Sequence, residues 1–495
     1  MTQPNHPRSS CSILTLLAFV VFLQPVNRAQ AEDFTSTVTS GSFAWDNSAN
    51  WTSAGGPGIP GASDSASVTS TASTTLTLSG TTSVETFYAT TDGVGGTKNL
   101  SLVSAGINNS IFNVGTLETE NLQNHTVEFN NGNTGGTLGV SVSGNLNHNG
   151  YIIQIGGANG LTGGFSVSGT TTMLSTINVA FVRTPTSPTD ITVQLGSLVQ
   201  EGGQLNIGSA TGAINNVEVN SLSATLSSRY IRLSAATGTL TIAGTEDASY
   251  AGGISEKADI NDNANPATQA LKVVKNGSSV QTFTRANNYV GGTEINAGTI
   301  LLSGAGKVGL GDVAIVGDDA VLDISTISAA SYTLNAETTP GGVGKQTLSG
   351  AGTVVATGKT LTILGTLAPG NSAGQLTMDG GTLDISNATS LDFELGTLSD
   401  SLLLINSANL TIGTLNFEDF QFTALSGFGA GEYILMSGWN SLSGSLGTTT
   451  GLISGLDSTL SIDGNSLLLT VVPEPGTALL LSLGMTFLVI FRRRA

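Results

Sequence analysis

Cysteine is almost absent from this chain of 495 residues, and its scarcity excludes several kinds of site. The only cysteine is Cys11, in an N-terminal segment that we expect to be removed from the mature protein. The remaining body then has neither a disulfide nor a thiol, which excludes a cysteine metal site and a cysteine nucleophile. Its stability must come from backbone hydrogen bonds and packed apolar side chains.

Charged and aromatic residues are also scarce. Charged residues make up 10% of the chain, where about a quarter is typical, and aromatic residues make up 5%. Between residues 32 and 472, acidic residues outnumber basic ones by 33 to 11. Because binding to nucleic acid needs clustered lysine and arginine, we expect no nucleic acid partner. Divalent cations or neutral glycans fit better, and the acidic surplus is also what solubility alone would favour.

Sustained helical periodicity is missing as well, and glycine is abundant in its place. The chain holds 65 glycines, and its hydrophobic fraction of 39% argues against disorder. Apolar and polar residues alternate instead, as in Thr-Leu-Thr-Ile at residues 360–363 and Leu-Asp-Ile at 383–385. This alternation predicts short β-strands separated by glycine turns.

A short phrase recurs along the body: Gly-Thr, a branched apolar residue, any residue and a further apolar residue. Its copies begin at Gly136, Gly238, Gly298, Gly381 and Gly413. Strands this short cannot each bury a face alone, but stacking them coil upon coil gives one continuous core. We therefore predict an all-β solenoid, in which asparagines at the turns stack along the axis. The alternative is a β-sandwich with Asn-Gly loops.

Residues 1–31 have the three parts of a secretory signal peptide. Arg8 supplies the positive start, Ile13–Leu23 is the apolar run, and Ala29-Gln30-Ala31 is a small-x-small cleavage site. The apolar run is shorter than the roughly 20 residues that span a bilayer. We expect cleavage after Ala31, with an uncleaved anchor as the alternative.

Residues 471–495 contain three different parts in order. Pro473-Glu474-Pro475 comes first, an apolar segment follows at residues 477–491, and Arg492-Arg493-Arg494 lies at the end. Fifteen helical residues rise about 22 Å, a little less than the roughly 30 Å hydrocarbon core, and arginine stems can extend that reach. We predict a single transmembrane helix with the arginines on the cytoplasmic side.

This tripartite tail resembles the PEP-CTERM sorting signal of Gram-negative and related bacteria. The resemblance covers about 23 residues and rests on Pro473, Glu474, Pro475, the short apolar span and the terminal arginines Arg492, Arg493 and Arg494. It implies recognition by an exosortase, a membrane protease that would cut near the Pro-Glu-Pro triplet. A simple membrane anchor is the alternative.

A second resemblance covers about residues 270–420. The segments Lys-Val-Val-Lys-Asn-Gly at 272–277, Phe-Thr-Arg-Ala-Asn-Asn-Tyr at 283–289 and Gly-Gly-Thr-Glu-Ile-Asn-Ala-Gly-Thr-Ile at 291–300 resemble the autotransporter-associated β-strand repeat. Leu-Ala-Pro-Gly-Asn-Ser-Ala-Gly at 367–374 is similar to the end of many autotransporter passenger domains. The resemblance implies a right-handed parallel β-helix outside the cell. Its domains would be a β-rich repeat region at 32–269 and the autotransporter-like repeat region at 270–470.

Catalytic patterns are hard to find. The body has two histidines, His125 and His148, both in Asn-rich segments that we interpret as exposed loops. A three-histidine zinc site is therefore excluded, and no Gly-x-Ser-x-Gly phrase stands at a convincing strand-to-helix turn.

Carboxylates are the other candidates for chemistry. Two groups could supply the acid pair of a glycoside hydrolase, although their spacing is that of strand exteriors. They are Asp318, Asp319 and Asp323, and Glu118, Glu120 and Glu128. The oxygen-rich stretch 259–265 lacks the glycine and glutamate of an EF-hand loop. We expect no catalytic residue, no cofactor and no resident metal.

These observations predict an exported, non-enzymatic structural or adhesive protein of the cell surface, outer envelope or extracellular matrix. Its expected partners are an exosortase-type protease and the membrane, with an extracellular polysaccharide as a candidate ligand. One alternative is a polysaccharide-active β-helix enzyme, a lyase or hydrolase, with Asp and Arg or Lys clustered in a groove. Another is a non-catalytic glycan-binding protein with Trp45, Trp51 or Trp439 exposed on one face, whereas tryptophans at solenoid ends would be partly buried.

Overall fold

The computed structural model describes most of the body of the chain. The described residues are 31–91, 98–107, 109–121, 125–132, 136–150, 152–157, 161, 163–181, 191–207, 215–233, 237–255, 270–334 and 345–472. The body begins as a compact unit of its own at Glu32. Most of its described residues form strands, and the only helices among them are the 3-10 turns η1 (Ser48–Asn50) and η2 (Phe417–Asp419).

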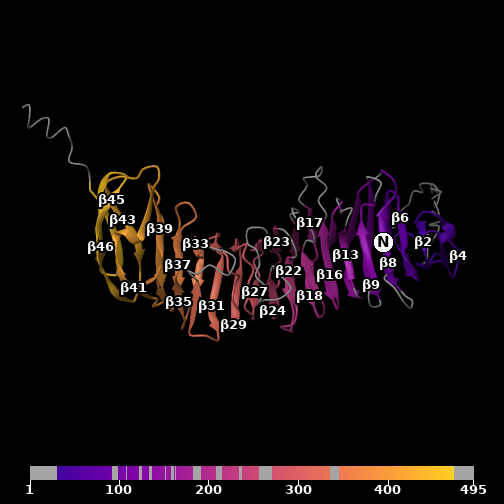
Figure 1. Ribbon diagram of the computed structural model, residues 1–495, viewed down its shortest axis with the longest axis horizontal. Coiled ribbons are helices and arrows are strands. Elements are labelled where there is room, and N and C mark those ends of the chain that lie inside the picture. Colours follow the sequence, from indigo (N-terminus) through magenta and orange to yellow (C-terminus); the bar gives the residue numbers. More distant parts are fainter. Residues whose placement is uncertain are drawn as a thin grey trace, which may run out of the picture. The chain divides into compact units, whose positions relative to one another are not determined.

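The strands form long parallel sheets (Figure 1). The first series pairs in chain order and consists of β1 (Asp33–Ser36), β5 (Ser65–Ser70), β7 (Thr81–Thr91), β9 (Ser110–Asn121), β11 (Leu138–Val142), β14 (Phe165–Val167), β17 (Ile191–Gln194), β20 (Asn215–Val219), β23 (Thr237–Ile242), β26 (Ala270–Lys275), β28 (Thr293–Ile295), β30 (Val313–Ile315), β33 (Thr347–Gly350), β36 (Thr366–Pro369), β39 (Ser390–Leu395) and β42 (Phe420–Ala424).

A second series follows the first in the coils from β11 onward. It consists of β12 (Leu146–Asn149), β15 (Thr170–Met173), β18 (Ser197–Gln200), β21 (Ser221–Ser223), β24 (Ala248–Tyr250), β27 (Val280–Phe283), β29 (Thr299–Gly304), β31 (Val321–Ile327), β34 (Thr353–Val355), β37 (Gln375–Asp379), β40 (Ser401–Ile405) and β43 (Gly431–Ser437). A bridge between Ala224 and Tyr250 joins its earlier and later parts.

The third side of the coils is formed by two further sheets. The first contains β2 (Gly41–Ala44), β6 (Thr74–Leu78), β8 (Lys98–Ser104), β10 (His125–Asn130), β13 (Ile152–Gly157), β16 (Thr176–Phe181), β19 (Gln204–Ile207), β22 (Tyr230–Leu233) and β25 (Gly253–Ser255). The second contains β32 (Ser331–Leu334), β35 (Thr360–Ile363), β38 (Thr382–Asp384), β41 (Asn409–Leu415) and β44 (Ser441–Leu446).

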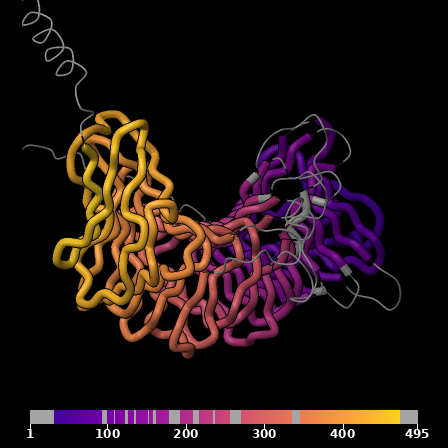
Figure 2. The backbone as a smooth tube through the Cα atoms, turned by 60° about the vertical axis from the view of Figure 1, so that its left-hand side comes forward, coloured from indigo at the N-terminus to yellow at the C-terminus, as the bar shows by residue number. Residues whose placement is uncertain are grey.

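The register shows how the chain advances from coil to coil. Val273 pairs with Thr293 and Thr293 with Val313, so these two coils are each 20 residues long. The backbone tube follows such coils through successive colours of the sequence (Figure 2). Since β23 pairs with β26, residues on both sides of the expected boundary at 269/270 belong to one sheet. The parallel pairing is compatible with the predicted β-helix or solenoid and excludes the alternative of an antiparallel sandwich.

Alternating side chains build the core inside the coils. In β35, Leu361 and Ile363 are buried while Thr360 and Thr362, which alternate with them, are half-buried, as the alternation predicted. The glycine of the Gly-Thr phrase precedes a strand at three of its five copies. At Gly238 and Gly413 the expectation is wrong, because Gly238 lies inside β23 and Gly413 lies inside β41, where the register with β44 shifts.

Glycine is required where a coil turns against its neighbour. Gly381 has a φ of +70°, and a Cβ there would lie 2.1 Å from the Ala356 carbonyl oxygen of the preceding coil. Only glycine adopts the left-handed conformation readily and has no Cβ that would clash with this carbonyl oxygen.

Asparagine side chains connect neighbouring coils, as predicted. Asn296 Nδ2 donates to Asn276 Oδ1 at 2.9 Å, and Asn440 Nδ2 donates to Asn409 Oδ1 at 3.2 Å. Each pair joins residues about one coil apart, so the amides form short ladders along the stacking direction.

Antiparallel strands and aromatic side chains cover the two ends of the stack. At the start, β3 (Trp51–Ser53) and β4 (Gly56–Pro57) pair antiparallel beside β1. At the other end, β45 (Thr450–Ile453), β46 (Leu456–Asp463) and β47 (Ser466–Val471) form antiparallel hairpins on β43. Such caps protect the open edges that would otherwise pair with other chains.

The three tryptophans belong to these ends and are buried. Trp51 is inaccessible to solvent, Trp45 is 3% exposed and Trp439 is 5% exposed. The hypothesis of an exposed tryptophan face for sugar rings is therefore wrong, because these rings fill the core where the stack begins and ends.

Candidate functional site

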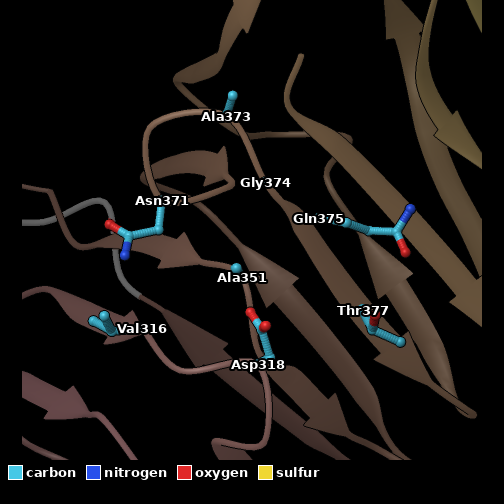
Figure 3. A pocket seen from close by; sticks show the side chains of 8 residues that line it. All are labelled: Val316, Asp318, Ala351, Asn371, Ala373, Gly374, Gln375 and Thr377. Carbon is cyan, nitrogen blue, oxygen red and sulfur yellow. The ribbon is translucent and has the colours of Figure 1, made fainter. Parts of the chain in front are cut away.

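A polar pocket opens where three successive coils turn from the first strand series to the second (Figure 3). Its volume is about 370 Å³. The lining residues are Val316, Asp318, Ala351, Asn371, Ala373, Gly374, Gln375 and Thr377. We take this pocket as the candidate site because it brings carboxylate, amide and hydroxyl groups together at one corner of the body.

The pocket exists because equivalent corners differ in the size of their side chains. Asp318 lies in the turn between β30 and β31, Ala351 lies between β33 and β34, and Asn371 lies between β36 and β37. The middle coil has only the methyl group of Ala351 at this corner. A larger side chain there would fill the space between Asp318 and Asn371.

The loop after β36 has an unusual backbone. Ser372 and Ala373 both have left-handed conformations, with φ of 60° and 68°, and Gly370 has a φ of 96°. Left-handed backbone in non-glycine residues is uncommon and persists only where surrounding contacts hold it. Hydrogen bonds of 2.8 and 3.0 Å between the backbones of Gly350 and Gly370 hold the beginning of the loop.

Asp400 holds the other end of this loop. Its Oδ1 accepts a hydrogen bond from the Gly374 backbone N–H at 3.0 Å, and its Oδ2 accepts one from the Glu394 N–H at 2.8 Å. The side chain is buried, at 3% exposure. Burial raises the pKa of the Asp400 carboxyl group, although the hydrogen bonds from Glu394 and Gly374 oppose the rise.

Replacing Asp400 with alanine should lower the free energy of unfolding by about 2 kcal/mol, because two partly buried N–H groups lose their acceptor. Faster hydrogen exchange at the Gly374 and Glu394 amides would locate the effect. The control is Asp392→Ala on β39, whose half-buried carboxylate accepts from the Ser390 hydroxyl and should cost less than about 0.5 kcal/mol. Equal losses in the two variants would contradict this role of Asp400.

The polar groups of the pocket do not converge on one point. The Asp318 carboxylate points toward Ala351, while the Asn371 and Gln375 amides point in opposite directions (Figure 3). The lining holds a single carboxylate and no basic side chain. Such a site can exchange hydrogen bonds with a hydroxyl-rich molecule or with water, but it lacks the paired acids of glycoside hydrolysis.

The predicted acid groups lie in different elements. Asp318 and Asp319 occupy an exposed turn, and Asp323 follows on β31, where its Oδ1 accepts from the Ser325 N–H. Glu118 and Glu120 lie on β9, and Glu128 lies on β10 in another sheet.

Two of these glutamates have identified hydrogen-bond partners. Glu118 Oε1 accepts from Asn147 Nδ2 at 2.7 Å, and Glu128 Oε2 accepts from the Ser101 hydroxyl at 3.3 Å. Burial raises the pKa of the Glu128 carboxyl group, while its side-chain hydrogen bonds with Asn130 and Ser101 act to lower it.

The interpretation of the histidines as exposed loop residues is wrong, because both lie on strands and His148 is also buried. His148 lies on β12 at an inward position and is 1% exposed, while His125 lies on β10. Thr119 Oγ1 lies 2.7 Å from His148 Nδ1, and the Thr176 carbonyl oxygen lies 3.1 Å from Nε2. Burial lowers the pKa of His148 to about 4, although the Thr176 carbonyl opposes the shift. The alternation that starts at Leu146 was the signal for this burial, but the neighbouring asparagines obscured it.

Several predicted residues lie outside the described part of the chain. They are Ala29, Pro473, Glu474, Pro475, Arg492, Arg493, Arg494, the apolar segments 13–23 and 477–491, and the oxygen-rich stretch 259–265. Ala31 lies at the start of the described residues, and β1 begins two residues later. Among the helices that the structure describes, none has the length and apolar character needed to cross a membrane.

The described residues contain no group of three or more histidine, cysteine, aspartate or glutamate side chains that could hold a metal ion. Comparison with known proteins adds no assignment to this geometry. The chain matches no protein-family model, and no curated protein matches it.

Proposed function

We propose that this chain is an exported structural or adhesive protein of the cell surface, outer envelope or extracellular matrix. The observation that carries the proposal is the stack itself, because most of the described strands pair in parallel around one continuous apolar core. In such a chain, most residues serve to build the stack, and the outer faces of the sheets are extended surfaces that can contact other molecules.

Backbone hydrogen bonding supports the structural role. Each coil adds about 4.8 Å along the stack and pairs its strands with those of both neighbours. Such ladders need no disulfide, which agrees with a body that lacks cysteine. We propose that the coils wind as a right-handed β-helix, the usual hand for connections between parallel strands.

Export would follow from the two ends of the sequence. Cleavage after Ala31 would leave Glu32 at the N-terminus, which is where the compact body begins. The C-terminal segment would hold the body at the membrane until an exosortase-type protease cuts near residues 473–475. The body would then pass to the surface or the matrix.

A non-catalytic role agrees best with the pocket. Its single carboxylate does not favour the polysaccharide-active enzyme, and the burial of the tryptophans does not favour sugar stacking on these rings. The candidate pocket is therefore assigned no reaction.

Cell fractionation with intact-mass measurement tests the proposal. In cells with the sorting protease, the mature protein should begin at Glu32, end near Pro473 and lie outside the cytoplasm. Cells without the protease, or cells making a Glu474→Ala/Pro475→Ala variant, should retain the C-terminal tail in the membrane fraction. Glu432→Ala, an exposed change on β43, serves as the control. An unprocessed C-terminus under every condition would refute sorting, and a cytoplasmic body would refute export.

A further inference from the structure

Two of the scarce arginines of this acidic chain lie over one tyrosine ring, and a third is the residue before that tyrosine. The guanidinium carbons of Arg232 and Arg285 lie 4.7 and 4.9 Å from the centroid of the Tyr230 ring, distances typical of cation–π contact. Arg285 Nη2 also donates to the Tyr230 hydroxyl at 3.2 Å. Arg229 directly precedes the tyrosine. We call these four residues the arginine–tyrosine cluster.

The cluster joins distant parts of the chain because the coil between them has a glycine. Tyr230 on β22 pairs with Gly253 on β25, and Arg285 comes from the segment after β27. A Cβ on Gly253 would lie 3.3 Å from Tyr230 Cδ1 and 3.5 Å from Arg285 Nη1. Arg285 therefore passes over Gly253 to reach the Tyr230 ring.

Two of the three guanidinium groups have no carboxylate partner among the described residues. Arg285 donates to the Ser227 carbonyl oxygen and to Tyr230, which are neutral groups. Arg229 makes a single long hydrogen bond of 3.5 Å to Ser228 Oγ, and its buried Nε has no partner in the described part of the chain. By contrast, Lys272 forms an ion pair with Glu294.

Accessible donors remain on both groups. Arg229, Tyr230 and Arg285 are half-buried, and Leu226 beside them is 52% exposed. A guanidinium that is stacked on an aromatic ring keeps its plane fixed, which suits the bidentate hydrogen bonds that a carboxylate accepts. The cluster thus places two uncompensated positive charges and several free donor positions at the surface of an otherwise acidic body.

We propose that the arginine–tyrosine cluster binds a carboxylate-bearing polysaccharide, with Arg229 and Arg285 contacting carboxylates and Tyr230 positioning Arg285. This inference rests on the proposed function, because it names the ligand class of the adhesive surface. Nucleic acid fits less well, since its dense phosphates require many basic residues and this body has a large acidic excess.

Binding of the purified full chain to polygalacturonate tests the inference. Fully methyl-esterified polygalacturonate has the same backbone without charge, and an oligothymidylate represents nucleic acid. Wild-type protein should bind the acidic polymer, bind it less tightly as salt rises, and bind the ester at least roughly tenfold more weakly. Equal affinity for the ester, tighter binding to the oligothymidylate or no binding at all would overturn the proposal.

Variants assign the binding to the cluster. Arg229→Gln/Arg285→Gln should weaken polygalacturonate binding by roughly tenfold or more. The matched control Lys345→Gln/Lys359→Gln removes the same charge from later coils and should change affinity less than about twofold. Equal losses in the two double variants would show only general charge attraction and would overturn the site.

Gly253→Val tests the positioning of Arg285 without removing a charge. Its side chain should separate Arg285 from Tyr230 and lower affinity, while an unchanged thermal midpoint would show that the coils remain folded. Unaltered affinity in a folded Gly253→Val protein would refute the positioning role of Tyr230. These binding measurements use purified protein, so their outcome is independent of the cell fractionation that tests export.

Discussion

Replacing Trp51 with alanine should lower the free energy of unfolding of the first coils by about 4 kcal/mol, the largest single effect that we expect. Trp51 has no exposed surface, and its ring centroid lies 4.7 Å from that of Trp45. Its Nε1–H donates to the Trp45 carbonyl oxygen at 2.9 Å. Alanine therefore leaves a large cavity and an unpaired backbone acceptor at the beginning of the stack.

The effect should be confined to one end of the body, because each coil contacts mainly its neighbours. Hydrogen exchange should accelerate in β2, β5 and β6 and stay unchanged near β39, and chemical denaturation would measure the loss. Trp51→Phe is the matched control, since it keeps a six-membered aromatic ring while removing the hydrogen bond and the pyrrole part of the indole; the bond accounts for about 1 kcal/mol, and the total loss should be smaller than for alanine. A uniform increase in exchange along all coils would contradict the picture of independent ends.

The sequence is most informative where one local rule decides the structure. Thr360–Ile363 was predicted as a strand from its alternation, and β35 has the same bounds. The turn before β38 was likewise predicted from the Gly-Thr phrase at Gly381, whose backbone is left-handed. Since both patterns recur along the chain, the β-rich body and its continuous core could be inferred without knowledge of any long-range contact.

The pocket could not be predicted in the same way. Asp400 is 26 residues from Gly374 in the sequence, and only the register of the coils brings its carboxylate to that loop. Coil lengths decide the register, and insertions at the corners make those lengths vary. The size of the pocket likewise depends on the alignment of Ala351 with Asp318 and Asn371, which no local pattern reports.

The arginine–tyrosine cluster could not be predicted from the sequence either, because it also depends on the register between coils. Arg285 and Tyr230 are 55 residues apart and meet across an intervening coil. The low content of basic residues gave no indication that Arg232 and Arg285 would both lie over the Tyr230 ring.

Acidification from pH 7 to pH 4 should remove about 3 kcal/mol of stability through His148 alone. The Thr176 carbonyl can only accept a hydrogen bond, so Nε2 carries the proton and Nδ1 accepts from the Thr119 hydroxyl. The neutral ring is thus fully paired in a buried site. Protonation adds a charge there without a compensating anion, which is why the folded-state pKa is about 4.

Because the pKa of His148 is lower in the folded chain than in the unfolded chain, its contribution to stability decreases as the pH falls. The unfolded chain binds a proton near pH 6.5 and the folded chain binds it only near pH 4, so His148 contributes its full stability above pH 6.5. That contribution falls as pH decreases between these values. Buried acids such as Asp400 and Glu128, whose pKa values are raised, contribute with the opposite sign.

Comparison with a His148→Gln variant isolates this contribution, because glutamine keeps a donor and an acceptor but does not titrate. Denaturation of both proteins at pH 7, 5.5 and 4 would give the difference at each pH, in which the acids common to both proteins cancel. The wild-type advantage should shrink by about 3 kcal/mol between pH 7 and pH 4. An advantage that stays constant with pH would mean that the buried imidazole takes up its proton as easily in the folded coil as in water, and the assignment of a neutral His148 would be wrong.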